Sequence, residues 1–229
     1  IVTGAVDLII VDYQCIMPAL VTVAGCYHTK VITTSPKAHF TGAEHVEFDL
    51  HNARDKARQA VLMAIEAYGR RDPKRVEIPC GPVPMMTGFS NEAVLAALGG
   101  TAGPLIDAIK AGSIRGAVGI VGCNNPRVKH DYANSELATE LIKKDILVLV
   151  TGCATVSTAK QGLLVPEAAD LAGPGLSAVC KALGIPPVLH VGSCVDNTRI
   201  IGLCAALANA LGVDISDLPV AAAAPEWYS

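Results

Sequence analysis

The sequence predicts an α/β protein with a doubly wound, mostly parallel sheet of the Rossmann-like kind, divided between parts of two such domains. Two observations carry this prediction. Short apolar runs alternate with longer amphipathic stretches, above all in the second half of the chain, and such alternation implies parallel strands joined by right-handed crossovers. The composition is 51% hydrophobic but only 4% aromatic, with 21 glycines, which suits closely packed layers of helices and strands.

The first part of the chain is expected to hold three strands and two helices. The strands are predicted at 6–13, 30–35 and 45–49, where the apolar runs are too short for helices. Pro18 suits the first turn of the first helix. Residues 51–69 predict a second, amphipathic helix whose apolar face carries Val61, Ile65 and Tyr68.

A domain boundary is predicted in the stretch 69–84. This stretch is charged and rich in proline, as is typical of a connector between domains. Residues 1–72 are accordingly expected to be the C-terminal part of a first α/β domain, and residues 73–229 most of a second one.

The second part of the chain alternates regularly between strands and helices. The strands are predicted at 115–122, 145–152, 186–192 and 218–224. The helices are predicted at 90–98, 104–112, 135–144, 155–164, 168–184 and 197–213. The helix at 168–184 is expected to break near Pro174, which has a glycine on either side.

The composition argues against several classes of protein. The net charge is −3 and no basic stripe is present, so neither nucleic acid nor a membrane surface is expected as a partner. No apolar run reaches the roughly 18 residues that a membrane span needs. Eight cysteines in a large α/β pattern without a CxxC motif favour a reducing, cytoplasmic compartment over a disulfide framework or a zinc ribbon.

Four of the cysteines follow the ends of predicted strands, and they are Cys15, Cys123, Cys153 and Cys194. Open α/β sheets bind their ligands outside the carboxyl ends of the strands, and thiolates gathered there favour a soft metal. The alternative interpretation treats each of them as a small core residue. That alternative fits the other four better, which lie in helical patterns or in the connector: Cys26, Cys80, Cys180 and Cys204.

Six segments carry a resemblance to a known family: DYQCIMPAL, CYHTKVITTSPKA, VGCNN, VTGCATV, VLHVGSCVDNTR and LPVAAAAPEWYS. In this order they resemble the catalytic subunit of anaerobic nickel–iron–sulfur carbon monoxide dehydrogenase, and the resemblance runs over all 229 residues. The hybrid-cluster (prismane) proteins are similar in architecture. Their version of the last cysteine motif is closer to GQCND, so they are the second interpretation.

The resemblance implies an oxidoreductase that catalyses CO + H₂O ⇌ CO₂ + 2H⁺ + 2e⁻ at a buried Ni–Fe–S cluster. Carried over residue by residue, Cys15, Cys123 and Cys153 resemble the iron ligands. Cys194 resembles the nickel ligand and is the predicted catalytic residue. Thiolates suit both metals. In the family, nickel takes the carbon of CO while a neighbouring iron activates water.

The resemblance also implies further 4Fe–4S clusters in an N-terminal region, a homodimer, and an electron carrier such as ferredoxin. The family's additional histidine and cysteine ligands precede residue 1 and its acid–base lysine follows residue 229, so residues 1–229 alone are expected to be inactive. A third hypothesis, from a different class, is a metal-free α/β protein whose cysteines are all structural.

Overall fold

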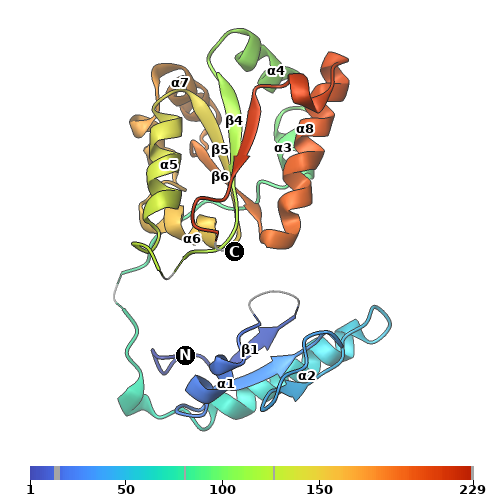
Figure 1. The fold of residues 1–229 in the computed structure, drawn as a ribbon, viewed down its shortest axis with the longest axis vertical. Coiled ribbons are helices and arrows are strands. Elements are labelled where there is room, and N and C mark those ends of the chain that lie inside the picture. Colours follow the sequence, from blue (N-terminus) through green and yellow to red (C-terminus); the bar gives the residue numbers. More distant parts are fainter. Residues whose placement is uncertain (13–15, 80, 126, 228–229) are drawn as a thin grey trace. The chain divides into compact units, whose positions relative to one another are not determined.

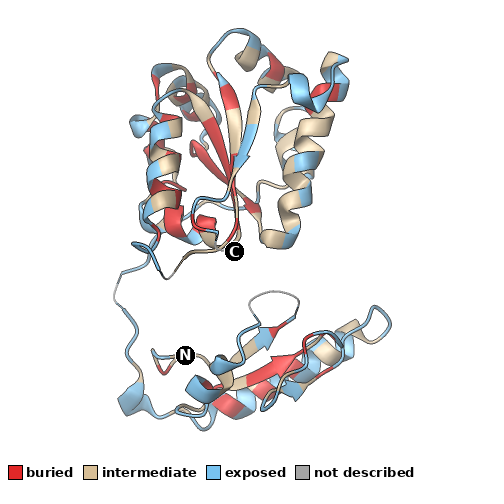
Figure 2. Cartoon of the chain, in the orientation of Figure 1, coloured by how far each residue is buried: buried red, intermediate tan, exposed pale blue. Residues whose placement is uncertain are grey.

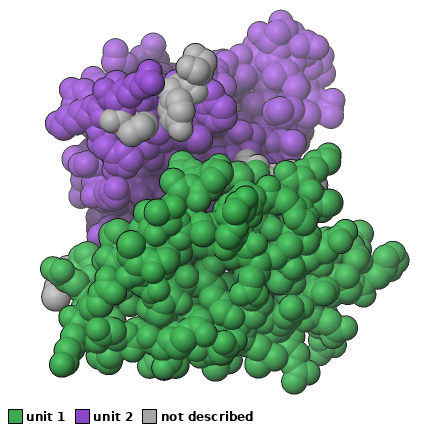
Figure 3. Space-filling view, turned by 60° about the horizontal axis from the view of Figure 1, so that its bottom comes forward, with its two compact units in different colours: residues 1–81 green, residues 82–229 purple. Residues whose placement is uncertain are grey.

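The computed structural model describes residues 1–12, 16–79, 81–125 and 127–227. The chain divides into two compact units, residues 1–81 and 82–229, which Figure 3 colours separately. Each unit is built on its own parallel sheet. The division falls within the charged, proline-rich stretch 69–84. Within the described part of the chain, no helix is both long and apolar enough to cross a bilayer.

The first unit contains a parallel sheet in the order β1-β2-β3 (Figure 1). Its elements are β1 Leu8–Val11, α1 Ala19–Ala24, β2 Lys30–Thr33, β3 Glu44–His45, α2 Ala53–Tyr68 and a 3₁₀ turn, η1 Pro73–Arg75. Helix α1 begins directly after Pro18, its N-cap residue. Strand β3 is shorter than the predicted 45–49 and begins one residue earlier; Glu44 and His45 pair with Ile32 and Thr33 of β2.

The structure confirms helix α2, but the face predicted to be buried is wrong. The buried positions are Ala60, Met63 and Ala67, and the helix packs on β1 and β2. The predicted positions, Val61, Ile65 and Tyr68, are 58%, 61% and 60% exposed. Small alanine side chains let the helix backbone lie close to the sheet. A prediction from hydrophobicity alone misses this close packing, because it assigns the largest apolar residues to the buried face.

The described residues of the second unit form four parallel strands in the order β6-β5-β4-β7. They are β4 Gly116–Ile120, β5 Ile146–Thr151, β6 Val188–Gly192 and β7 Val220–Ala223. Strand order therefore runs outward from β4 to β6 and then returns to the other side of β4 with β7. The reversal between β4 and β7 is a topological switch point, where open α/β sheets bind their ligands.

Helices cover both faces of this sheet, with α5 and α7 on one side and α3 and α8 on the other (Figure 1). The helices are α3 Asn91–Ala97, α4 Gly103–Lys110, α5 Tyr132–Ile142, α6 Gly152–Lys160, α7 Pro174–Leu183 and α8 Asn197–Leu211. Three 3₁₀ segments complete the unit, η2 Pro166–Leu171, η3 Cys194–Asp196 and η4 Ile215–Asp217. The predicted doubly wound, parallel architecture is confirmed, as is the break before Pro174.

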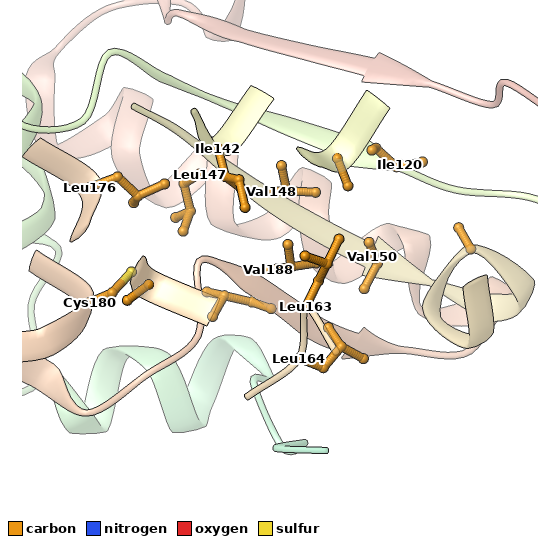
Figure 4. Close-up of a cluster of buried hydrophobic side chains, with 14 of the residues drawn as sticks. Ile120, Ile142, Leu147, Val148, Val150, Leu163, Leu164, Leu176, Cys180 and Val188 are labelled. Carbon is orange, nitrogen blue, oxygen red and sulfur yellow. The ribbon is translucent and has the colours of Figure 1, made fainter. Parts of the chain in front are cut away.

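The main core of the second unit lies along β5 and β6, where these strands meet the helices on one face (Figure 4). Val148, Val150 and Val188 supply the strand side, and Leu176 packs against them from α7 with no exposed surface. Figure 2 shows these central strands as the most continuously buried part of the unit. A rigid sheet of this kind fixes the positions at which its loops begin.

Cys180 of α7 belongs to this core and is 1% exposed. Burial raises the pKa of its thiol to about 11, so the side chain is a neutral hydrophobe at pH 8. We expect Cys180→Ala to lower the free energy of unfolding by about 1 kcal/mol, as truncation of a small core side chain does. The exposed Cys26 is the control, since Cys26→Ala should change stability by less than about 0.5 kcal/mol. Urea denaturation of the three proteins measures both effects.

Candidate metal centre

Three of the predicted cysteines follow the carboxyl ends of three neighbouring strands in the second unit. Cys123 follows β4, Cys153 follows β5 and Cys194 follows β6. Neighbouring strands lie roughly 4.8 Å apart, so the three loops open at one sheet edge within on the order of 10 Å of each other. All three side chains are partly exposed. The fold therefore gathers three thiols at the edge where an α/β sheet binds ligands.

The backbone next to Cys153 and the side chain of Cys194 lie in direct contact. Gly152 has a positive φ of 58°, and a Cβ built on it would collide with the Sγ atom of Cys194. The hydroxyl of Thr151, at the end of β5, also donates a 2.6 Å hydrogen bond to the Oδ1 atom of Asn197, the first residue of α8. Glycine at position 152 leaves the space that the Cys194 sulfur occupies.

Cys194 is held by a capping box around its 3₁₀ turn. The Asp196 carboxylate accepts hydrogen bonds from the backbone N–H of Ser193 at 2.8 Å and from its hydroxyl at 3.1 Å. The same carboxylate accepts one from Arg199 at 2.8 Å. Arg199 and then the Ser193 N–H hold the pKa of Asp196 below its usual range. This turn fixes the Cys194 backbone before α8 begins.

Cys153 occupies the first turn of α6, because that helix begins at Gly152. The sequence predicts that this helix starts at residue 155. That prediction is wrong by three residues, because α6 begins directly after β5. The difference has a chemical consequence, since the first turn is where a helix dipole favours a negative group such as a thiolate. Further along the helix, the Ser157 hydroxyl oxygen lies 3.3 Å from the Cys153 carbonyl oxygen.

A buried polar network lies behind Cys123 and Cys153, and sequence reasoning missed it. Asp131 is 8% exposed and accepts hydrogen bonds from the Asn124 amide at 2.6 Å, the Ser157 hydroxyl at 2.8 Å and Lys160 at 2.7 Å. Burial alone would raise the pKa of Asp131, but the hydrogen bonds from Lys160 and Ser157 outweigh it and lower the pKa. Glu226, which follows β7, joins the same network through Asn124.

Part of this network left a signal in the sequence. The apolar strand 218–224 is followed almost at once by an acidic residue, Glu226, and an acid at the carboxyl end of a buried strand is a candidate for a site. Asp131 and Ser157 left none, because each lies in a stretch that also suits an exposed loop or helix.

The remaining cysteines divide as follows. Cys180 is buried in the core and Cys204 is half-buried in α8. Cys26 is exposed just after α1, where its thiol lies 3.7 Å from the Thr22 carbonyl oxygen. Cys15 and Cys80 lie outside the described residues.

The three thiols suit a polynuclear cluster better than a single ion. In the described ranges no three His, Cys, Asp or Glu side chains converge closely enough to hold one metal ion. A metal–sulfur cluster takes about one thiolate per metal atom, so its ligands come from separate loops and lie farther apart. The soft donor set of three thiols fits such a group.

Comparisons with known proteins show which family the chain belongs to. A model of the Prismane/CO dehydrogenase family matches residues 1–229. Carbon monoxide dehydrogenase 1 of Methanosarcina mazei is 56% identical over 229 residues, which are 100% of this chain and 36% of that protein. The carbon monoxide dehydrogenase of Rhodospirillum rubrum is 48% identical over 243 residues, covering 100% of this chain and 38% of the relative.

A solved structure gives the same result. The Ni-free crystal structure of carbon monoxide dehydrogenase from Thermococcus sp. AM4 has a TM-score of 0.91 and 59% sequence identity, and the match covers 100% of this chain and 36% of that one. The chain thus spans little more than a third of the length of these relatives. By its sequence and its fold, the chain belongs to the Prismane/CO dehydrogenase family.

Proposed function

We propose that the full-length protein is an anaerobic carbon monoxide dehydrogenase that interconverts CO and H₂O with CO₂, two electrons and two protons. The observation that carries this proposal is the arrangement of Cys123, Cys153 and Cys194 at the ends of three adjacent strands. They stand in VGCN, TGCA and GSCVDN motifs, in the order on which the resemblance to the dehydrogenases rests. The similarity to named carbon monoxide dehydrogenases over the whole chain supports the same conclusion.

Each cysteine has a proposed role. Cys15, Cys123 and Cys153 hold the iron atoms, and Cys194 holds nickel. When bound, the Ni–Fe–S cluster supplies a soft metal for CO and a Lewis acid for water. The part of Cys15 rests on the family motif alone, since that residue lies outside the described ranges.

The protein's own contribution is to hold these sulfurs in fixed positions. The capping box of Ser193 and Asp196 orients Cys194, and the start of α6 orients Cys153. Ligand positions that do not change between redox states reduce the reorganisation that accompanies electron transfer. The close approach of the Gly152 backbone to the Cys194 sulfur limits the positions that this sulfur can take.

The partners of the full-length protein follow from the same proposal. We expect CO, CO₂ and water as small-molecule partners and an electron carrier such as ferredoxin as the redox partner. Further 4Fe–4S clusters in the part of the protein outside this chain would carry the electrons, in a cytoplasmic homodimer.

Anaerobic metal analysis of the purified full-length protein, combined with a viologen-reduction assay under CO, tests the proposal. We expect nickel together with iron, and reduction that depends on CO. Iron without nickel and without CO-dependent reduction would instead indicate a hybrid-cluster redox enzyme. Absence of both metals after reconstitution with iron, sulfide and nickel would contradict the proposal and favour structural cysteines.

A further inference from the structure

Glu226 is a charged residue with almost no contact with solvent. It follows β7 and is 1% exposed. Its carboxylate accepts five hydrogen bonds, from Ala133 N at 2.9 Å, Asp131 N at 3.2 Å, Asn134 N and Asn124 Nδ2 at 3.3 Å, and Asn125 N at 3.4 Å. Every one of these donors belongs to the segment 124–134, which runs from Cys123 to the first turn of α5.

The two oxygens of Glu226 serve different parts of that segment. Oε1 accepts from Ala133 and Asn134, at the N-terminus of the 11-residue helix α5. Oε2 accepts from Asn124, Asn125 and Asp131, in the loop that directly follows Cys123. One carboxylate therefore ties the cysteine loop to the helix behind it. The contact spans about a hundred residues of sequence, so it joins the two sides of the switch point between β4 and β7.

The neighbouring Trp227 holds the other side of the same loop. Gly122, directly before Cys123, has a positive φ of 96°, and a Cβ built on it would collide with the Trp227 ring. The Val121 N–H donates to the Ala223 carbonyl oxygen at 2.9 Å, which keeps the two chains together up to this point. Residues 226 and 227 thus contact the chain on both sides of Cys123.

The charge of Glu226 is essential to these contacts. Burial alone would raise the pKa of its carboxyl, but the hydrogen bonds from Asn134 N, Asn125 N and the Asn124 side chain outweigh it and lower the pKa. A carboxylate can accept at both oxygens, whereas an amide can accept only at one and places N–H groups at the other. Five N–H groups point at this side chain, so the NH₂ group of an amide would face some of these donors and could not accept their hydrogen bonds.

We infer that Glu226 is a positioning residue for Cys123, fixing the loop 122–125 from the far side of the switch point so that the sulfur is presented to the cluster. The effect of Glu226 on the cluster rests on the proposed function. Its effect on the position of the Cys123 loop does not depend on that function. Glu226 and Trp227 thereby couple the segment after β7 to Cys123, in the loop that follows β4.

The test replaces Glu226 by glutamine in the full-length protein. A control variant, Glu140→Gln, removes an exposed carboxylate that pairs with Lys143 at 2.7 Å near the other end of α5. Two readouts are taken: the alkylation rate of each cysteine after anaerobic removal of metal, and the electron paramagnetic resonance spectrum of the reconstituted protein.

In Glu226→Gln we expect Cys123 to react faster by on the order of 10-fold, which corresponds to the loss of one charge-assisted hydrogen bond that keeps the loop closed. Cys194 and Cys180 should react at wild-type rates, and the cluster spectrum should change. The control should match wild type in both readouts. A Cys123 rate equal to that of the control, or an equal acceleration of all three cysteines, would overturn the positioning role.

If Glu226→Gln does not fold, Asn124→Ala removes the side-chain donor beside Cys123 that Glu226 and Asp131 share, and we expect an acceleration in the same direction. No acceleration there would overturn the inference as well. The two proposals fail separately. A wild-type protein that takes up no nickel or iron contradicts the proposed function, while the alkylation rates of the metal-free protein still decide the role of Glu226.

Discussion

Replacing Cys194 by alanine in the full-length protein is expected to reduce CO oxidation by more than about 100-fold. Loss of a residue that only supports a metal ligand costs up to about 100-fold, and loss of the ligand itself should cost more. Cys194 stands in a 3₁₀ turn at the sheet edge and is partly exposed. Its side chain therefore contributes more to a metal than to packing, and the fold should remain intact. The nickel content should fall with the activity.

Cys204→Ala is the matched control, because Cys204 lies in the following helix α8 and is also half-buried. This variant should keep its activity and lose about 1 kcal/mol of stability. Viologen reduction under CO, metal analysis and thermal unfolding compare the two variants. Wild-type turnover in Cys194→Ala would contradict the role of this residue and favour structural cysteines.

Gly152→Ala is the second change with a large expected effect. It adds a methyl group where the Cys194 sulfur lies, at a φ of 58°. The positive φ alone costs about 1 to 2 kcal/mol in stability. The added methyl group also displaces the Cys194 sulfur from its position. We therefore expect nickel occupancy and CO oxidation to fall at least about 10-fold, as when a metal ligand loses its supporting contacts.

Gly162→Ala separates these two contributions. Gly162 lies just after α6, has a φ of 71°, and has no atom within 4 Å of the position of a Cβ. The two variants should therefore lose similar stability in urea denaturation, while only Gly152→Ala loses nickel. Equal nickel content in both would show that the space beside the Cys194 sulfur is not needed by the metal centre.

The fold could be predicted from the sequence because its signals are local. Apolar runs such as 145–152 and the amphipathic stretches between them mark the strands and helices within a few residues. Parallel pairing then follows from the need to join strands through helices. The cysteines at the ends of β4, β5 and β6 could be found for the same reason, since their place depends only on where each strand stops.

Predictions that depended on packing were less successful. The buried face of α2 was wrong because alanines allow a close approach that larger residues do not. The start of α6 was placed at residue 155, although Gly152 begins the helix directly from the strand.

The contacts of Glu226 could not be predicted, although its place after the last strand is a signal in the sequence, because they join residues that lie about a hundred positions apart. Such a contact has no period or motif. It depends on the strand order, which brings β7 beside β4 although β5 and β6 lie between them in sequence.

The most direct test of the metal centre is anomalous X-ray diffraction from crystals of the anaerobically purified full-length protein, with data on either side of the nickel and iron absorption edges. The proposed roles predict a nickel peak about 2.3 Å from the Sγ atom of Cys194, a typical metal–thiolate distance. They also predict iron peaks at similar distances from Cys123 and Cys153. Nickel bound elsewhere, or no anomalous peak at these three sulfurs in a protein that oxidises CO, would contradict the account.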